Sequence, residues 1–198
     1  MNNLPEITVQ QLLTSACLLQ KFILEQDLSL GRPFHHPKRF GSSFAMRFNI
    51  QCATLKDTEL LAGHRLSMWR DILPELATCV TDTEERTIEW IREKLSLGKL
   101  VGFIAKTEEG QVAGSGCIWI REQPPLPMSQ LLEVPYLMSL YTEKEFRRKG
   151  VARLIAETAI AWCRTHDYDR VNLDASEAGK SLYKTLGFKP GYGMRLQL

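Results

Sequence analysis

A short basic segment combines the residue types that bind phosphate groups. Residues 140–142 have the pattern of a strand end, and a turn at 143–149 leads into a helix that begins near Gly150. The first turn of a helix exposes N–H groups without partners and carries a partial positive charge. Gly150 and Ala152 are small enough for ligand oxygens to approach the backbone, and full positive charges come from Arg147, Arg148, Lys149 and Arg153. The segment therefore predicts a site for a phosphate, and in particular for a pyrophosphate.

Two common phosphate-binding motifs do not describe this segment. It lacks the GxxxxGK[ST] pattern of P-loop proteins and the GxGxxG pattern of dinucleotide-binding proteins. The pattern Arg-x-x-Gly-x-Ala, from Arg147 to Ala152, is by itself also compatible with a solvated basic helix start. A second signal is needed to choose between the two interpretations.

That second signal follows the predicted helix. Residues 175–188 read Ala-Ser-Glu-Ala-Gly-Lys-Ser-Leu-Tyr-Lys-Thr-Leu-Gly-Phe. Together the two segments resemble the GNAT superfamily of N-acetyltransferases. The run from Arg147 to Ala152 resembles the family's pyrophosphate motif, and Leu182-Tyr183 with Gly187-Phe188 resembles its LY…GF helix and strand. The resemblance covers residues 46–198 and favours the pyrophosphate interpretation.

For the cofactor, the resemblance implies acetyl-CoA bound between two splayed parallel strands, here residues 134–142 and 170–175. Main-chain groups of Leu140 and Thr142 would pair with the pantetheine arm, and N–H groups from 148 to 153 would hold the pyrophosphate. Ser176 stands where the family often has an Asn, and its hydroxyl can still donate a hydrogen bond. The expected cofactor-binding residues are Leu140, Tyr141, Thr142, Arg147, Arg148, Lys149, Gly150, Val151, Ala152, Arg153, Ser176, Gly179 and Tyr183.

The implied reaction is direct transfer of an acetyl group from the thioester to a primary amine of a small molecule or a peptide. Such an amine has a pKa near about 10, so a base or a water chain must take its proton. A free main-chain N–H near Leu140 would stabilise the oxyanion. Tyr183 stands at the position of the family's general acid and would protonate the leaving thiolate. Direct transfer needs no nucleophilic Cys.

The base and the acceptor pocket are less well defined by the sequence. Glu133, at the start of the first splayed strand, is the first candidate for the base, and the others are Glu122, His64 and Asp174. A lone His on a mostly apolar face more often has a structural role. The acceptor pocket is expected from the 68–82 connection, the 122–133 loop and the last strand, with Trp69, Trp119 and Tyr136 as aromatic residues and Glu75, Asp82 and Glu133 as acidic ones.

The elements that must position these residues follow from the spacing of apolar residues and the turn signals. Strands are expected at 46–52, 100–106, 111–121, 134–142, 170–175 and 192–198, with a hairpin turn at Glu108-Glu109-Gly110 between the second and the third. Helices are expected from the capping residues Thr54–Asp57 to the Leu73-Pro74 break, from Thr81–Glu84 to Gly98, at 150–166 and at 176–186. This order predicts an α/β fold: a mixed, mostly antiparallel sheet with helices on both faces, in agreement with the GNAT fold.

Residues 1–45 have a different pattern and form a separate predicted unit. A capping box at Thr8–Gln11 opens an amphipathic helix that ends near Asp27, and an irregular connector follows. His35 and His36 lack further metal-ligand residues nearby, so a solvated loop is favoured over a metal site. The apolar stretch at 12–24 is too short and too polar to span a membrane, and no signal peptide is expected. This unit could also join a second copy in a homodimer.

Composition excludes several classes of function. The 198 residues include 25 Lys and Arg against 23 Asp and Glu, so the net charge of +2 offers no general attraction to nucleic acid or membranes. The five cysteines form no CxxC motif, so neither a zinc site nor a disulfide framework is expected. An odd number of scattered cysteines predicts that the protein lies in the reducing cytoplasm. Each cysteine is expected to be a small buried residue. The rival to an enzyme is an acyl-CoA-binding sensor without turnover, or a dimerising interaction module.

Overall fold

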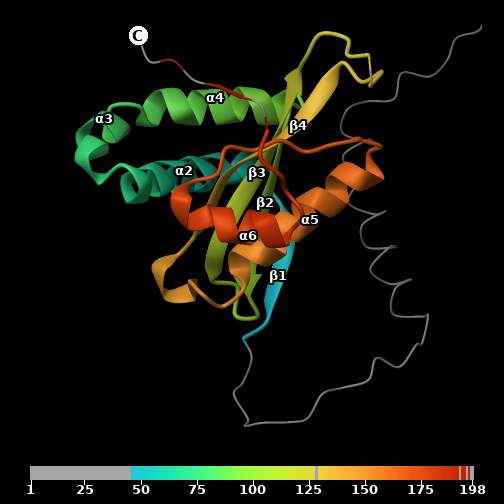
Figure 1. Cartoon of the computed structure of the whole chain (residues 1–198). Helices are drawn as coiled ribbons and strands as arrows, with labels where there is room; N and C mark the ends of the chain where they lie inside the picture. The colour runs from blue at the N-terminus through green and yellow to red at the C-terminus, as the bar shows by residue number, and fades with distance from the viewer. Residues whose placement is uncertain (1–45, 128, 192, 195, 197–198) are drawn as a thin grey trace, which may run out of the picture. The chain divides into compact units, whose positions relative to one another are not determined.

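The computed structural model describes residues 46–127, 129–191, 193–194 and 196. The predicted helix, connector and histidine pair at 1–45 lie outside the described residues. The strands are β1 (Phe48–Cys52), β2 (Leu100–Thr107), β3 (Val112–Glu122) and β4 (Glu133–Thr142). The helices are α2 (Thr58–Ile72), α3 (Ala77–Thr81), α4 (Glu84–Ser96), α5 (Val151–Thr165) and α6 (Lys180–Thr185), with short 3₁₀ turns η1 (Leu55–Asp57), η2 (Pro74–Leu76), η3 (Lys144–Phe146) and η4 (Glu177–Gly179) (Figure 1).

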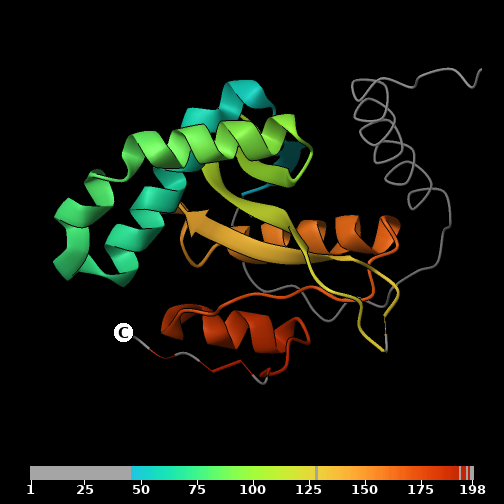
Figure 2. The same cartoon turned by 90° about the horizontal axis from the view of Figure 1, so that it is seen from above.

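The four strands form an antiparallel sheet in the order β1-β2-β3-β4, with α5 on one face and α2 and α4 on the other (Figure 2). Side chains of a strand point alternately to the two faces. Phe103 and Ala105 of β2 thus join the core under α5, whereas Leu100 and Ile104 join the core under α2 and α4. The predicted α/β fold with helices on both faces of a sheet is confirmed, while the sheet itself is antiparallel throughout its four strands.

Local sequence signals account for most of the helix and turn boundaries. The predicted cap before α2 is a complete capping box. The Thr54 side chain accepts from the main-chain N–H of Asp57, and the Asp57 side chain accepts from the main-chain N–H of Thr54. The predicted hairpin turn has Gly110 at φ +87°, a conformation that favours glycine. The signal at Thr81–Glu84 was less accurate: Thr81 ends the unexpected helix α3, and the N-cap of α4 is Thr83, whose side chain makes no capping bond.

Two predicted strands do not form as expected. The predicted parallel strand at 170–175 consists of one bridge, in which Leu137 N–H donates to Asn172 O at 2.8 Å and Asn172 N–H donates to Pro135 O at 2.9 Å. Val171 and Leu173 still pack on the core under α5, which explains the alternating pattern. Of the predicted strand at 192–198, the described residues 193, 194 and 196 are irregular, and the rest lie outside the described residues. The splay of two parallel strands stays a prediction.

A β-bulge interrupts β4 in the middle of the predicted cofactor strand. Ser115 pairs with Tyr141 and Cys117 pairs with Met138, so two residues of β4 lie opposite Gly116 alone. One of the two, Ser139, has φ +54°, in the left-handed region. A bulge leaves an extra residue outside the ladder and turns the strand. No signal for this bulge was found in the sequence.

The close approach of β3 to β4 beside the bulge yields a stability prediction. A Cβ on Gly114 would lie 2.4 Å from Tyr141 O, a backbone atom that cannot move aside cheaply. We expect Gly114→Ala to lower the free energy of unfolding by about 1–3 kcal/mol, as other overpacked sites do. The matched control is Gly63→Ala in α2, where nothing lies within 4 Å of the added Cβ. That change should raise stability by up to about 1 kcal/mol, since Ala is the better helix former. Urea unfolding of both variants measures the two changes in the free energy of unfolding, which should have opposite signs. Equal changes would contradict the packing argument.

The cysteines agree only in part with the expected burial. Among the described residues, Cys79, Cys117 and Cys163 are free thiols and Cys52 is half-buried, while Cys17 lies outside the described residues. Burial raises the pKa of both Cys117 and Cys163 to about 12, which makes them unreactive packing residues. Cys79 is exposed, contrary to the prediction, because it lies on α3, a short helix without buried residues.

Two classes of site find no support in the described part of the chain. Across residues 46–127, 129–191, 193–194 and 196, no three His, Cys, Asp or Glu side chains come together as a metal site would require. None of the helices described there is both long and apolar enough to cross a membrane.

Candidate functional site

The predicted anion site lies where the chain leaves β4 and enters α5. The turn η3 follows β4, and the chain then reverses through Arg148 at φ +63° and Gly150 at φ +88°. Gly150 is the N-cap of α5, and among the residues that the structure describes no side chain bonds to the helix start. The first N–H groups of a fifteen-residue helix therefore remain available to a ligand, as the sequence predicted.

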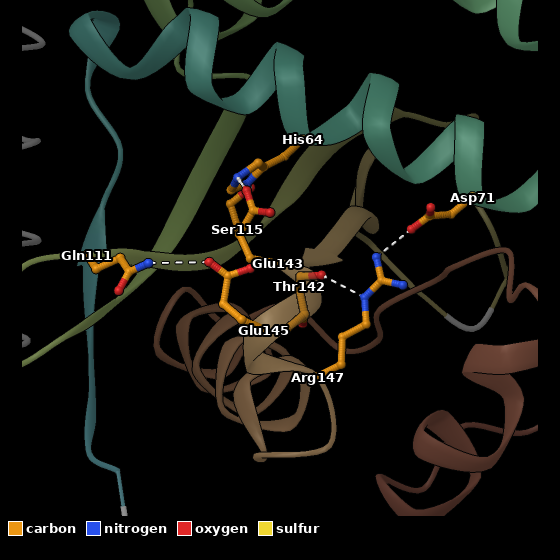
Figure 3. Close-up of polar contacts among 8 residues, drawn as sticks. All are labelled: His64, Asp71, Gln111, Ser115, Thr142, Glu143, Glu145 and Arg147. Atoms are coloured by element: carbon orange, nitrogen blue, oxygen red, sulfur yellow. Dashed lines mark hydrogen bonds and ion pairs between the residues drawn. The ribbon is translucent and has the colours of Figure 1, made fainter.

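Two of the four predicted basic residues hold this turn in place. Arg147 Nε donates to Thr142 O at 3.1 Å, and Arg147 Nη2 donates to Asp71 Oδ2 at 2.5 Å, so the guanidinium joins the end of β4 to α2 (Figure 3). Arg153 Nη2 donates to Thr185 Oγ1 at 2.6 Å and so joins α5 to α6. The other two, Arg148 and Lys149, are exposed. The hydrogen bonds of Arg147 thus fix the backbone of the turn, and the exposed Arg148 and Lys149 carry its positive charge into solvent.

Thr142, at the end of β4, carries a polar atom that needs a partner. Its Oγ1 is buried and makes no hydrogen bond to any described residue. A buried hydroxyl without a partner is unusual and costs roughly 1–3 kcal/mol. Because Thr142 precedes the basic turn and belongs to the predicted cofactor-binding set, this atom fits a site that a ligand completes.

Tyr183 lines a cavity on the α6 side of the sheet. The cavity has a volume of about 420 Å³, and its lining includes Leu173, Asp174, Ala175, Tyr183 and Phe188. The Tyr183 ring meets Phe188 edge-on, at 5.7 Å between centroids, and burial raises the pKa of the phenol, so it stays protonated at neutral pH. A Cβ on Gly179 would lie 2.9 Å from the Tyr183 ring and 3.4 Å from Ser176 Oγ. The structure therefore brings together three residues of the predicted site: Ser176, Gly179 and Tyr183.

The candidate bases are spread over the structure, and among these four only Asp174 lines the Tyr183 cavity. Together with burial, Asp174 raises the pKa of Tyr136 to about 12. Glu133 lies at the opposite end of β4 from Thr142, in an ion pair with Lys99. Glu122 pairs with Glu133 in the ladder. The fourth candidate, His64, belongs to a buried network.

His64 links α2 to β3 and to the end of β4. Its ring is buried; Nδ1 lies 2.8 Å from Ser115 Oγ and Nε2 lies 3.1 Å from Glu143 Oε1 (Figure 3). Burial lowers the pKa of His64, although Glu143 opposes this effect. In the neutral ring, Nε2–H donates to the carboxylate, which can only accept, and Nδ1 accepts from the Ser115 hydroxyl. Both ring nitrogens are thus occupied, in agreement with the structural role that the sequence favoured.

This network predicts how stability depends on pH. The ordinary pKa of the ring is 6.5, and the pKa of His64 in the folded protein is lower. When the pH falls below 6.5, the unfolded chain therefore binds a proton at His64 more readily than the folded chain does. The contribution to stability is therefore complete above this pH and is lost as the pH falls through it. We expect wild type to lose more stability than His64→Gln between about pH 7.5 and about pH 5.5, measured as Tm. His166→Gln, which changes an exposed ring, is the control and should retain the wild-type loss. An unchanged pH dependence in His64→Gln would contradict the prediction.

A second cavity lies on the other face of the sheet, between α4 and strands β3 and β4. Its volume is about 620 Å³, and its lining includes Arg65, Trp90, Trp119 and Met138. Trp119 was expected in an acceptor pocket, whereas neither Trp69 nor Tyr136 is among the lining residues. The contribution of α4 was missed, because the apolar side of this helix looked in the sequence like an ordinary core face.

Comparison with known proteins identifies the family. The profile of the acetyltransferase (GNAT) family matches residues 66–188. Human N-acetyltransferase 8 is 28% identical over 115 residues, which are 57% of this chain and 47% of that protein. The chain thus spans about half the length of this curated relative.

Solved structures share the fold of the described part. A GCN5-related N-acetyltransferase from Ralstonia eutropha superposes with a TM-score of 0.71 at 23% identity, over 77% of this chain and 99% of that one. A predicted acetyltransferase with acetyl-CoA from Clostridium acetobutylicum gives 0.68 at 25% identity, over 76% and 96%. The matched residues include the basic turn, the start of α5 and Tyr183, and the chain belongs to the GNAT acetyltransferase family.

Proposed function

We propose that this protein transfers the acetyl group of acetyl-CoA directly to a primary amine. The observation that carries the proposal is the helix start at Gly150, which no side chain in the described part of the chain caps and which the Arg147 bonds hold against the end of β4. The similar Clostridium structure that contains acetyl-CoA supports the choice of cofactor. The buried Thr142 hydroxyl and the cavity beside Tyr183 supply an unpaired polar atom and a space that the rest of the cofactor would occupy.

The fit to acetyl-CoA involves main-chain and side-chain groups. The N–H groups at the start of α5, with the exposed Arg148 and Lys149, match the two negative charges of a pyrophosphate. Beyond the single bridge at Asn172, the outer edge of β4 would pair with the pantetheine arm through main-chain groups of Leu140 and Thr142. Bound acetyl-CoA would supply an activated thioester carbonyl at the inner end of this path.

The chain's own groups would then handle the charges and protons of the reaction. A main-chain N–H in the bulge, near Leu140, would donate to the oxyanion as it forms. The Tyr183 hydroxyl, kept protonated by burial, would give its proton to the leaving thiolate. Glu133 stays the first candidate for the base that the sequence predicts. Its ion pair with Lys99 holds the carboxylate in place at its own end of β4. Asp174 is the alternative, since it lines the same cavity as Tyr183.

Two measurements test the proposal on the full chain. Calorimetric titration should show binding of CoA that is at least about tenfold tighter than that of ATP or NAD, because both compete for the pyrophosphate site but lack the pantetheine arm. Mass spectrometry of a broad amine panel after incubation with acetyl-CoA should show products that gain one acetyl group. Absence of CoA binding would overturn the proposal, whereas CoA binding without any acetylated product would indicate an acyl-CoA sensor.

A further inference from the structure

Arg65 places a positive charge, partly removed from water, in the wall of the 620 Å³ cavity. Its Nη1 donates to Ser139 Oγ at 3.0 Å, and its guanidinium lies over the Trp69 ring at 5.7 Å. Within the described part of the chain, Arg65 forms no ion pair. A guanidinium carries five N–H donors and stays charged in proteins. Most of its capacity to bind a carboxylate is therefore unused.

The surroundings of Arg65 confirm that its charge lacks compensation. Burial lowers the pKa of Arg65, and the groups that oppose this effect are Cys117 and Tyr136, neither of which is a carboxylate. Glu89 and Glu93 also line the cavity, but neither forms an ion pair with Arg65, and Glu93 Oε1 lies 2.7 Å from Lys94 Nζ. Removing a charge from water without an opposite charge nearby is unfavourable. An anionic ligand would offset this cost.

The position of Arg65 connects the cavity to the predicted reaction centre. Its hydrogen bond ends on Ser139, the left-handed residue of the bulge in β4. Met138, the neighbouring residue, lines the same cavity. The bulge also carries the main-chain N–H expected to stabilise the oxyanion. An acceptor held at Arg65 would thus have its nearest atoms beside the thioester carbonyl.

The rest of the lining indicates what the acceptor carries besides its negative charge. Trp90 and Trp119 meet edge-on at 5.1 Å between centroids, and Met138 adds a third apolar surface. Such a wall favours an apolar or aromatic group over a sugar or a polyamine. The exposed Arg86 at the lining adds a second positive charge near the opening.

We propose that the acceptor is a free α-amino acid with an apolar or aromatic side chain, whose carboxylate binds Arg65. The inference rests on the proposed function and narrows its substrate class. Only one carbon separates the carboxylate of an α-amino acid from its amine, so an ion pair with Arg65 brings the amine to the bulge. The side chain then occupies the space beside Trp90 and Trp119.

The test compares matched substrates in which only the negative charge differs. L-Phenylalanine and L-leucine are assayed against their amides with wild type, Arg65→Gln and Arg65→Lys. We expect wild type to prefer each acid in kcat/KM, and Arg65→Gln to lose this preference by about 10- to 100-fold, the usual effect of a charge-assisted hydrogen bond. Arg65→Lys, which keeps the charge but not the planar fork, should be intermediate. Arg92→Gln is the control, since Arg92 pairs with Glu59 outside the cavity.

A binding experiment separates this inference from the proposed function. N-acetyl-L-phenylalanine and its amide are titrated into the CoA-bound protein, which requires no turnover. Preferential binding of the acid by wild type, lost in Arg65→Gln with unchanged Tm and CoA affinity, supports the inference even if no acetylation occurs. The inference is overturned if wild type does not distinguish acid from amide, or if Arg65→Gln weakens both equally. Turnover of other amines in that case would leave the proposed function standing.

Discussion

Tyr183→Phe is expected to lower kcat by about 100-fold or more, the usual contribution of a positioned general acid, while CoA binds with affinity within about twofold of wild type. The reason lies in the surroundings of the ring. Tyr183 packs edge-on against Phe188, and the ring, not the hydroxyl, makes these contacts, so Phe fills the same space. Burial keeps the phenol protonated, and its loss removes the proton that the leaving thiolate takes. Steady-state kinetics with calorimetric CoA titration measures both effects.

The chain offers a matched control for this substitution. Tyr168 is also a partly buried tyrosine whose pKa is raised by burial, and it packs against the same core. Its neighbours are Trp162 and Glu133, at the far end of β4 from the basic turn. With Asp174 as the base, Tyr168→Phe should leave kcat within about twofold of wild type. A loss of kcat in Tyr168→Phe with unchanged Tm would instead indicate Glu133 as the base, since the Tyr168 hydroxyl contacts that carboxylate. Equal losses of kcat and of Tm in the two variants would show that packing, not proton transfer, explains the effect. A protein that binds CoA but shows no turnover in wild type would be the sensor instead.

Local patterns in the sequence were sufficient to find the basic turn and the start of α5. A left-handed glycine before an amphipathic helix, preceded by arginines, depends only on neighbouring residues, and the structure places Gly150 as the N-cap. The hairpin glycine Gly110 and the capping box at Thr54 were predicted for the same reason. These features require no knowledge of what packs against them.

Contacts between distant segments could not be predicted in this way. Asp71 and Arg147 are 76 positions apart, and His64 lies 51 positions from Ser115 and 79 from Glu143. Each pair meets only because α2 lies across β3 and β4 on one face of the sheet (Figures 1 and 2). An Asp on a helix and a His on an apolar face carry no local sign of their partners. The contact through which α2 holds the basic turn in place therefore became apparent only from the structure.

The predicted strands at 170–175 and 192–198 show a related limit. Alternating apolar residues indicate which side chains face a core, and Val171 and Leu173 do face it. A strand also requires a neighbouring backbone at hydrogen-bonding distance, and β4 supplies this only at Asn172. The bulge at Ser139 has the same origin, since it depends on how β3 and β4 are aligned rather than on either sequence alone.

Gly150→Ala is expected to weaken CoA binding by about tenfold or more without preventing folding. At φ +88°, an L-residue costs about 1–2 kcal/mol, and relief of that strain would rotate the first N–H groups of α5 away from the ligand. Apart from the two neighbouring residues in the chain, no described residue lies within 4 Å of the added Cβ, so the methyl group would occupy the open space that the pyrophosphate oxygens approach. Calorimetric titration with CoA and thermal unfolding separate the two effects.

Gly98→Ala is the matched control for the backbone strain. Gly98 has φ +66°, and its added Cβ also has no described residue within 4 Å other than its chain neighbours. It lies in the turn before β2, at the opposite end of the sheet from the basic turn. Both variants should lose similar stability, about 1–2 kcal/mol, since both force Ala into the left-handed region. Only Gly150→Ala should lose CoA affinity, because only there does the strained residue open a helix toward the ligand. If both variants bind CoA as wild type does, the pyrophosphate does not lie at the start of α5, and the proposed function fails with it.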